Sequence, residues 1–509
     1  MSFILADGRL ITMNDRREIL ESGSVCVQHD RIAAVGTRQQ LQQRYPEAEA
    51  VDCTGRIVMP GMVNTHTHLF QTLLKGLGDD MVLKKWFTCM TGPSAVHLTA
   101  RDAHAAALHG CTESIRSGVT TVVDFMYVHP QPGMIKSVVE AFDATGMRGF
   151  VCRGFISTGV QYDIPAALIE RPPAALADAK EQIRRYNKPG GRVQVGLAPN
   201  MIWAVDEEGY RLTRKLADEE HVLITTHVAE TTFELETAAA CYGMNDTQFL
   251  SDIGFLGPDV IAVHCVHCKT EDIEIMRQHG TKVSHNPCSN MYLASGCAPI
   301  PEMLRAGVTV GLASDGPASS NNHSLFQAMK FAALQQKGAH QDATIITAEK
   351  VLEMATIDGA RAVGLEAEIG SIEVGKKADI VVLDYNNAFM TPIHHPVSAI
   401  VYSALGHEVT SVMIDGRFVM RDGIVGAVDE AAVRRQAQTS ADALTQRAGT
   451  DSFNRRPWPK TVGWEREKKP QVSPLRYPGF PGGLGRVGEL SCGFLYGKPH
   501  TRFTVGAAQ

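Results

Sequence analysis

Short runs rich in β-branched residues alternate with longer Ala- and Leu-rich segments from about residue 57 to residue 370. The longer segments have helical period and include 101–117, 206–220 and 345–363. Eight runs are typical of buried strands: 57–65, 119–124, 148–153, 192–198, 222–228, 259–265, 281–285 and 308–314. This alternation predicts an α/β fold, a closed (β/α)8 barrel of the TIM type. The main rival is an open doubly wound sheet, but no glycine-rich phosphate loop follows an early strand.

Both ends of the chain have a different pattern. Residues 1–58 are typical of short strands and turns, and β patterns return at 378–384 and 409–420. We expect these segments to pair in one small β-sandwich domain built from the N- and C-terminal segments. The predicted order is the N-terminal sandwich segment (1–58), the barrel (59–370), the C-terminal sandwich segment (371–430), then a helix and an irregular tail (431–509). The tail is Pro-, Gly- and Arg-rich, which argues against a packed core there.

Composition excludes several function classes. The net charge of −6 and the pI near 6.3 give no reason to expect a nucleic-acid partner or an anionic membrane. No apolar stretch approaches the roughly 20 residues that span a bilayer, and the N-terminus lacks the pattern of a signal peptide. The 11 cysteines are odd in number and scattered, which favours reduced thiols. We therefore expect a cytoplasmic protein.

Two histidines, His66 and His68, follow the first predicted barrel strand. In a strand, side chains i and i+2 point to the same face, so both imidazoles leave the strand in one direction. Two neutral imidazoles that converge are half of a divalent metal site. Taken alone, the pair is equally compatible with two unrelated loop histidines.

The same chemistry recurs at later strand ends. Strand 222–228 carries His227 with Glu230 three residues on, strand 259–265 carries His264, and Asp315 follows strand 308–314. Each residue alone has an ordinary explanation, such as a satisfied loop histidine or a turn aspartate. Catalytic groups of a barrel lie at the carboxyl ends of its strands, so the repetition indicates one shared metal site.

These motifs, in this order, resemble the amidohydrolase superfamily, in its branch of heterocycle deaminases and triazine hydrolases. The segments that carry the resemblance are 59–68, 226–230, 263–267, 284–290, 314–316 and 368–379, and it extends over roughly residues 5–430. The resemblance implies a metal-dependent aminohydrolase that uses a metal-bound hydroxide to release ammonia from an aromatic N-heterocycle. Similar enzymes are commonly oligomers, so we expect a homo-oligomer by analogy.

The resemblance also implies the ligands of one divalent ion, Zn²⁺ in preference to Fe²⁺: His66, His68, His227 and Asp315. Glu230 would move protons between the water, a ring nitrogen and the leaving group. Asp315 would also aim the water, and His264 would orient it and stabilise the tetrahedral adduct. Asn200 ends the fourth strand and cannot bridge two cations, which favours a single metal. For His267 we favour a structural role that supports the site, and His285 stays without an assigned role.

The substrate is less constrained. Relatives that accept purine nucleosides place a Glu where this chain has Ala95, which favours a free base, a pterin or a triazine as the small-molecule substrate. Trp86 is expected to stack on a flat ring or simply to pack. Arg153 is expected either to contact the substrate or to form an ion pair across the rim, and Asn200 to bind a ring edge.

Three alternatives stay open at this point. Within the enzyme class these are an s-triazine chlorohydrolase or alkylaminohydrolase and a purine-nucleoside-type deaminase on the same scaffold. Outside it, a degenerate barrel could act as a binding protein, although every candidate ligand and Glu230 are present.

Overall fold

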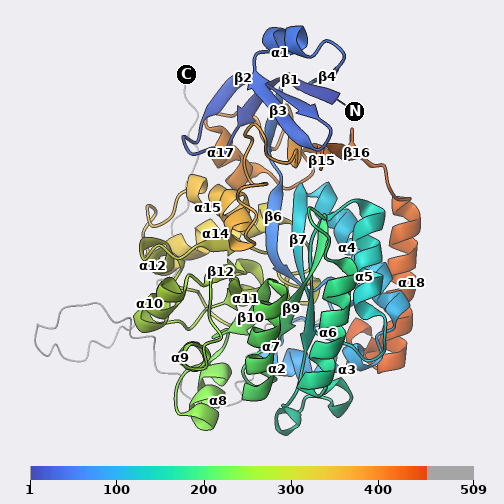
Figure 1. Ribbon diagram of the computed structural model, residues 1–509, viewed down its shortest axis with the longest axis vertical. Helices are drawn as coiled ribbons and strands as arrows, with labels where there is room; N and C mark the ends of the chain where they lie inside the picture. Colours follow the sequence, from blue (N-terminus) through green and yellow to red (C-terminus); the bar gives the residue numbers. More distant parts are fainter. Residues whose placement is uncertain (1, 456–509) are drawn as a thin grey trace, which may run out of the picture. The chain divides into compact units, whose positions relative to one another are not determined.

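The computed structural model describes residues 2–455, and an eight-stranded parallel sheet forms its centre (Figure 1). The strands follow one another in chain order: β6 (Met62–Thr67), β7 (Val119–Met126), β8 (Arg148–Phe155), β9 (Val193–Pro199), β10 (Ile224–Val228), β11 (Val260–His264), β12 (Lys282–His285) and β13 (Val310–Leu312). The first and last strands meet, since the Thr65 hydroxyl donates to the Leu312 carbonyl over 3.2 Å. The Asp315 amide donates to the His66 carbonyl over 3.2 Å. The predicted barrel is confirmed.

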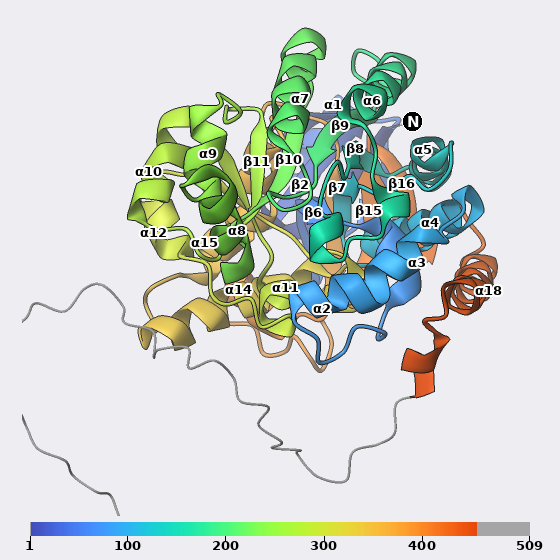
Figure 2. The same ribbon diagram turned by 90° about the horizontal axis from the view of Figure 1, so that it is seen from below.

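Helices surround the strands, as the view along the barrel shows (Figure 2). They include α4 (Ala100–Arg116), α5 (Met134–Thr145), α6 (Pro172–Tyr186), α7 (Glu207–Glu220), α8 (Thr232–Tyr242), α9 (Asp246–Asp252), α10 (Thr270–His279), α12 (Ile300–Arg305) and α14 (Leu325–His340). Predicted helix 345–363 is divided at Thr356 into α15 (Ala348–Ala355) and α16 (Ile357–Ala362). Thr356 has ψ −94°, which is outside the helical region and accounts for the break.

A second sheet joins the two ends of the chain. Its strands run in the order β17-β16-β15-β14-β5-β1-β2-β3, with β4 paired to β1. Their bounds are β1 (Ser2–Ile11), β2 (Ile19–Gln28), β3 (Arg31–Gly36), β4 (Glu49–Asp52), β5 (Arg56–Pro60), β14 (Ile380–Asp384), β15 (Val409–Ile414), β16 (Arg417–Arg421) and β17 (Ile424–Val425). N-terminal β5 pairs antiparallel with C-terminal β14, so both ends contribute to one sheet, as predicted.

The first predicted barrel strand, 57–65, is wrong as a single element. The structure divides it at Gly61: β5 belongs to the second sheet and β6 to the barrel. A side chain at Gly61 would lie 2.1 Å from the Thr120 hydroxyl, so only glycine fits where the chain passes between the sheets. A continuous apolar run conceals this change because both halves are buried strands.

Ion pairs hold the second sheet and the barrel together. The buried Arg148 guanidinium at the start of β8 donates to Asp379 over 2.7 Å and also contacts Asp415. Helix α18 (Glu430–Ala448) packs against α4 (Figure 1). From residue 456 the predicted irregular tail lies outside the described residues. Among the described residues, no helix is both long and apolar enough to cross a membrane.

Candidate metal centre

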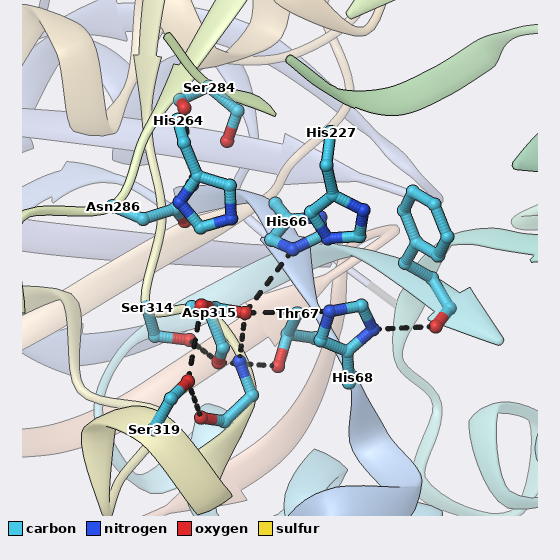
Figure 3. Close-up of polar contacts among 12 residues, drawn as sticks. His66, Thr67, His68, His227, His264, Ser284, Asn286, Ser314, Asp315 and Ser319 are labelled. Carbon is cyan, nitrogen blue, oxygen red and sulfur yellow. Dashed lines mark hydrogen bonds and ion pairs between the residues drawn. The ribbon is translucent and has the colours of Figure 1, made fainter. Parts of the chain in front are cut away.

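Three imidazoles converge at the carboxyl ends of β6 and β10. His66 lies within β6, His68 directly after it, and His227 within β10. The ring centroids of His66 and His68 are 4.7 Å apart, and those of His66 and His227 are 5.1 Å apart. Figure 3 shows the three rings facing one another, with Asp315 beside them. The sequence-based expectation that the two i, i+2 imidazoles share one direction therefore agrees with the geometry.

Asp315 brings a carboxylate to the same point from the loop after β13. Its Oδ1 atom is 3.3 Å from His66 Nε2 and 3.6 Å from His68 Nε2 (Figure 3). The Ser319 hydroxyl donates to Oδ2 over 3.2 Å, and the Gly316 amide donates to Oδ1 over 2.6 Å. Burial, the largest single effect, raises the pKa of Asp315. The neighbouring imidazoles together lower it by more and hold it well below its usual value. The side chain is therefore an ionised oxygen donor.

The hydrogen bonds around the imidazoles leave donor lone pairs toward the centre. The His68 Nδ1–H donates to the Phe125 carbonyl over 2.8 Å, and the His227 Nδ1–H donates to the Asn200 carbonyl over 2.9 Å. A carbonyl only accepts, so each ring carries its proton on Nδ1 and exposes the lone pair of Nε2. Burial lowers the pKa of all three rings, which favours the neutral form that binds metals.

The ring nitrogens of His66 indicate that the cluster of imidazoles fits a cation. Within the described residues, His66 is fully buried, its Nδ1 has no hydrogen-bond partner, and its Nε2 has only the Asp315 carboxylate oxygen at 3.3 Å. A buried polar atom without a partner is costly, and a cation removes that cost. The ligand atoms of His66, His68 and His227 all lie within 4.8 Å of one another, as do those of His66, His264 and Asp315. This set of nitrogen and oxygen donors fits one divalent metal ion.

Glu230 and His264 lie next to the imidazole cluster. His264 Nε2 is 3.4 Å from a carboxyl oxygen of Glu230, and the Ser295 hydroxyl donates to the other oxygen over 3.2 Å. Burial, with Asp315 next in importance, raises the pKa of Glu230 to about 8. One carboxyl group that holds a proton near neutral pH and one that stays ionised are the arrangement expected for acid–base chemistry.

A cavity connects these groups. Its lining comprises His68, Gln71, Leu83, Trp86, Phe87, Tyr127, Asn200, Met201, His227, Glu230, His264, Leu293, Asp315 and Ser319. Trp86 and Asn200, both candidates from the sequence, are among them. The Trp86 indole donates to the Ala318 carbonyl over 3.0 Å, which fixes the ring. Both side-chain atoms of Asn200 are buried without a partner among the described residues, so they are available to a ligand.

Arg153 is placed differently. Its buried guanidinium pairs with Glu170 over 2.6 Å and with Asp178 over 2.9 Å, and it is not among the residues that line the described cavity. Of the two interpretations left open by the sequence, the structure has the ion pair. Two acidic partners engage the guanidinium donors that a substrate would need, and the substrate contact of Arg153 stays a prediction.

Some residues that line the cavity or contact its lining carried no signal that sequence reasoning used. Gln71 follows the histidine pair by three residues, and both of its amide atoms are buried without an acceptor or donor among the described hydrogen bonds. Asn290 accepts from His264 Nδ1 over 2.8 Å, a role that its motif 284–290 did not reveal. His267 donates to the Ser295 carbonyl over 3.0 Å, so it braces the residue that contacts Glu230. The proximity of Gln71 to the histidine pair could have identified it.

A parallel barrel with imidazoles and a carboxylate converging at its strand ends is the architecture of a metal-dependent hydrolase. The chain belongs to the amidohydrolase family, whose model matches residues 57–419. A short segment, 25–48, also matches the imidazolonepropionase-like composite domain of bacteria. The family predicted from the motifs is thereby confirmed.

Named relatives extend over nearly the whole described chain. A 5'-deoxyadenosine deaminase of Methanothermobacter thermautotrophicus is 38% identical over 84% of this chain and 96% of its own. A 5-methylthioadenosine/S-adenosylhomocysteine deaminase of Acetivibrio thermocellus is 34% identical over 85% and 97%. A crystal structure of an adenosine deaminase from Xanthomonas campestris with bound zinc superposes with a TM-score of 0.82 at 29% identity, over 87% of this chain and 98% of that one. The predicted class, a hydrolase acting on carbon–nitrogen bonds, agrees with all three names.

Proposed function

We propose that the protein is a metal-dependent deaminase of an adenosine-type nucleoside. The observation that carries this proposal is the convergence of three neutral imidazoles and an ionised carboxylate beside a protonatable Glu230. The named relatives support the nucleoside class, which the sequence had left as an alternative to a free base, a pterin or a triazine. Ala95 had argued against a ribose, but it is buried in α3 (Gly92–Val96) and is not among the residues described as lining the cavity.

We propose one divalent ion, Zn²⁺, held by His66, His68, His227 and Asp315. Nitrogen donors with one oxygen donor suit zinc, and the zinc-bound Xanthomonas campestris structure supports that metal. When bound, the ion would supply a coordinated water whose pKa falls toward about 7. Asn200 is found where a second metal would need a bridging carboxylate, which supports a single ion.

Glu230 and His264 perform the proton and charge steps. Glu230 takes one proton from the attacking water and delivers it to a ring nitrogen, and the remaining hydroxyl proton of the adduct then passes to the departing amino group. Its raised pKa suits this exchange, because a group that titrates near the working pH both accepts and releases a proton readily. His264 carries its proton on Nδ1, which donates to Asn290, so its Nε2 lone pair accepts a hydrogen bond from the attacking water and orients it. Ammonia then leaves, and the ring keeps a carbonyl oxygen.

The remaining cavity wall suits a flat heteroaromatic ring. Trp86 offers a fixed aromatic face, and Phe87 and Leu83 add apolar surface beside it. The free amides of Asn200 and Gln71 can pair with donors and acceptors on the ring edge. This combination of an apolar face and a polar edge is what a purine base requires.

The test is ammonia release from a substrate panel together with one variant. The panel contains 5'-deoxyadenosine, 5'-methylthioadenosine, S-adenosylhomocysteine and adenosine against guanine, cytosine, a pterin, melamine and atrazine. We expect turnover on the nucleosides; turnover confined to the other compounds would overturn the substrate proposal. Glu230→Gln keeps size and polarity but cannot carry the proton, so we expect about 10²–10⁴-fold lower kcat with metal content unchanged. Undiminished kcat in this variant would refute the role of Glu230.

A further inference from the structure

The backbone on both sides of Glu230 is held by buried carboxyl groups. The Ala229 amide donates to Asp246 Oδ2 over 2.6 Å, and the Thr231 amide donates to Glu234 Oε2 over 2.7 Å. Asp246 begins α9 and Glu234 lies in the first turn of α8. Two carboxyl groups from two different helices therefore grip the residues immediately before and after Glu230.

Both of these carboxyl groups are withdrawn from solvent. Glu234 is 0% exposed and Asp246 is 2% exposed. Carboxylic side chains are almost never fully buried unless a specific interaction requires it. Burial first, and then the nearby carboxyls Glu230 and Asp246, raise the pKa of Glu234 well above its usual value. A neutral Glu234 still accepts a hydrogen bond from the Thr231 amide. This hydrogen bond therefore does not require a negative charge on Glu234.

The segment that the two acids hold is conformationally strained. Ala229 has φ +48°, in the left-handed region that residues with a Cβ rarely adopt. Such a conformation persists only where the surroundings determine it from several sides. The Asp246 carboxylate fixes the Ala229 amide, and the His267 amide fixes the Ala229 carbonyl over 2.9 Å. The unusual turn aims Glu230 toward His264.

We propose that Glu234 and Asp246 are positioning residues for Glu230: together they clamp its flanking amides and set the direction of its carboxyl group. This inference rests on the proposed function, since it assumes that Glu230 moves the protons. Misplacement of a catalytic group by about 1 Å lowers turnover by roughly 10²-fold. The clamp therefore contributes to kcat and leaves both the metal ligands and the aromatic wall of the cavity untouched.

The primary variants are Glu234→Met and Glu234→Gln. Methionine has nearly the same size but no acceptor for the Thr231 amide, whereas glutamine keeps an acceptor oxygen and is neutral. We expect kcat of Glu234→Met to fall about 10–100-fold with KM within about twofold and metal content unchanged. Glu234→Gln is expected to stay within about threefold of the parent kcat. Equal losses in both variants, an unchanged kcat in Glu234→Met, or a KM that rises in step would overturn the proposal.

Asp246→Leu provides a second test if Glu234→Met does not fold. Oδ2 of Asp246 accepts from the Ala229 amide and Oδ1 accepts from the Thr247 amide over 3.0 Å, and leucine removes both acceptors at similar size. A fall in kcat at constant KM supports the clamp, and an unchanged kcat overturns it.

The matched control is Gln40→Met at α1 (Arg38–Arg44), where Gln40 accepts from the Thr37 amide over 3.1 Å in the same way. It is expected to leave kcat unchanged. The two proposals fail in different ways. If the proposed function is wrong, Glu230→Gln stays active; if only the positioning role of Glu234 and Asp246 is wrong, Glu230→Gln is inactive and Glu234→Met keeps the parent kcat.

Discussion

The cavity has two halves that are built differently. The metal half is lined by His68 directly after β6, His227 on β10 and Asp315 after β13, and the fully buried His66 on β6 adjoins them. Hydrogen bonds orient His68, His227 and Asp315. The aromatic wall consists of Leu83, Trp86 and Phe87, which lie on the short helices α2 (Leu83–Trp86) and η2 (Phe87–Thr91) between β6 and β7.

The contrast separates chemistry from selectivity. Strand ends share one rigid hydrogen-bonded sheet, so ligands placed there keep fixed mutual distances. The aromatic wall lies on the connection between β6 and β7, outside the sheet. Such connections tolerate sequence change better than the strands and helices that they join. We therefore expect substitutions of the metal ligands to abolish turnover. Substitutions of residues on the substrate side of the cavity should mainly change KM.

His66→Ala should have the largest effect. This substitution removes one of the proposed metal ligands, a fully buried imidazole that belongs to both groups of neighbouring ligand atoms. We expect loss of bound metal and at least about a 10³-fold fall in kcat, because the ion supplies several kcal/mol of transition-state stabilisation. Metal analysis of purified protein, coupled to ammonia release, measures both. The exposed His97→Ala is the control, and full metal content in His66→Ala would contradict the ligand assignment.

Asn290→Leu tests whether orientation alone matters in the metal half. Asn290 accepts from His264 Nδ1 over 2.8 Å, and leucine removes that acceptor at similar size. We expect kcat to fall about 10–100-fold while metal stays bound, as is typical when the partner of an active-site histidine is lost. Asn290→Asp, which keeps an acceptor, should recover most of the activity. A loss of metal in the leucine variant would instead place Asn290 among the groups that hold the ion.

Asn200→Ala tests the substrate side. Its main-chain carbonyl, which orients His227, survives the substitution, whereas its free side-chain amide is removed. We expect KM to rise about tenfold with a smaller change in kcat, which corresponds to one lost hydrogen bond of about 1.4 kcal/mol. Steady-state kinetics on the best nucleoside of the panel measures the split. A tenfold fall in kcat at constant KM would instead show that Asn200 acts in the chemical step and not in substrate binding.

Arg153→Met should have the smallest effect on catalysis. The guanidinium pairs with Glu170 and Asp178, whose side chains are 24% and 41% exposed. We expect the free energy of unfolding to fall by about 2 kcal/mol, below the value for fully buried pairs because solvent screens the partners. Thermal unfolding measures this change, and KM should stay constant. A raised KM without loss of stability would restore the substrate contact considered for this residue.

Much of the fold and of the candidate centre was predictable because its signals are local. A strand has period two, so His66 and His68 had to share a face, and parallel strands end at one edge, so His227, His264 and Asp315 were expected near them. Arg153 was not decidable in this way. Its position at the end of β8 was clear, but Glu170 and Asp178, which lie 17 and 25 residues further on, satisfy it through a fold that local patterns do not describe.

The change of sheet at Gly61 shows the same limit. Apolar residues on both sides of it are buried, and burial in two different sheets leaves the same hydrophobic run. The grip of Asp246 and Glu234 on the segment around Glu230 likewise depends on where α8 and α9 pack.

The sequence by itself determined the barrel, the pairing of both chain ends in a second sheet, and the residue types at the strand ends, because periodicity and strand polarity are short-range properties of a chain. Only the tertiary structure decided which side chains line the cavity, which are engaged by ion pairs and which buried acids hold Glu230. Those outcomes depend on contacts between residues far apart in sequence, and desolvation at such contacts sets both their energy and their protonation.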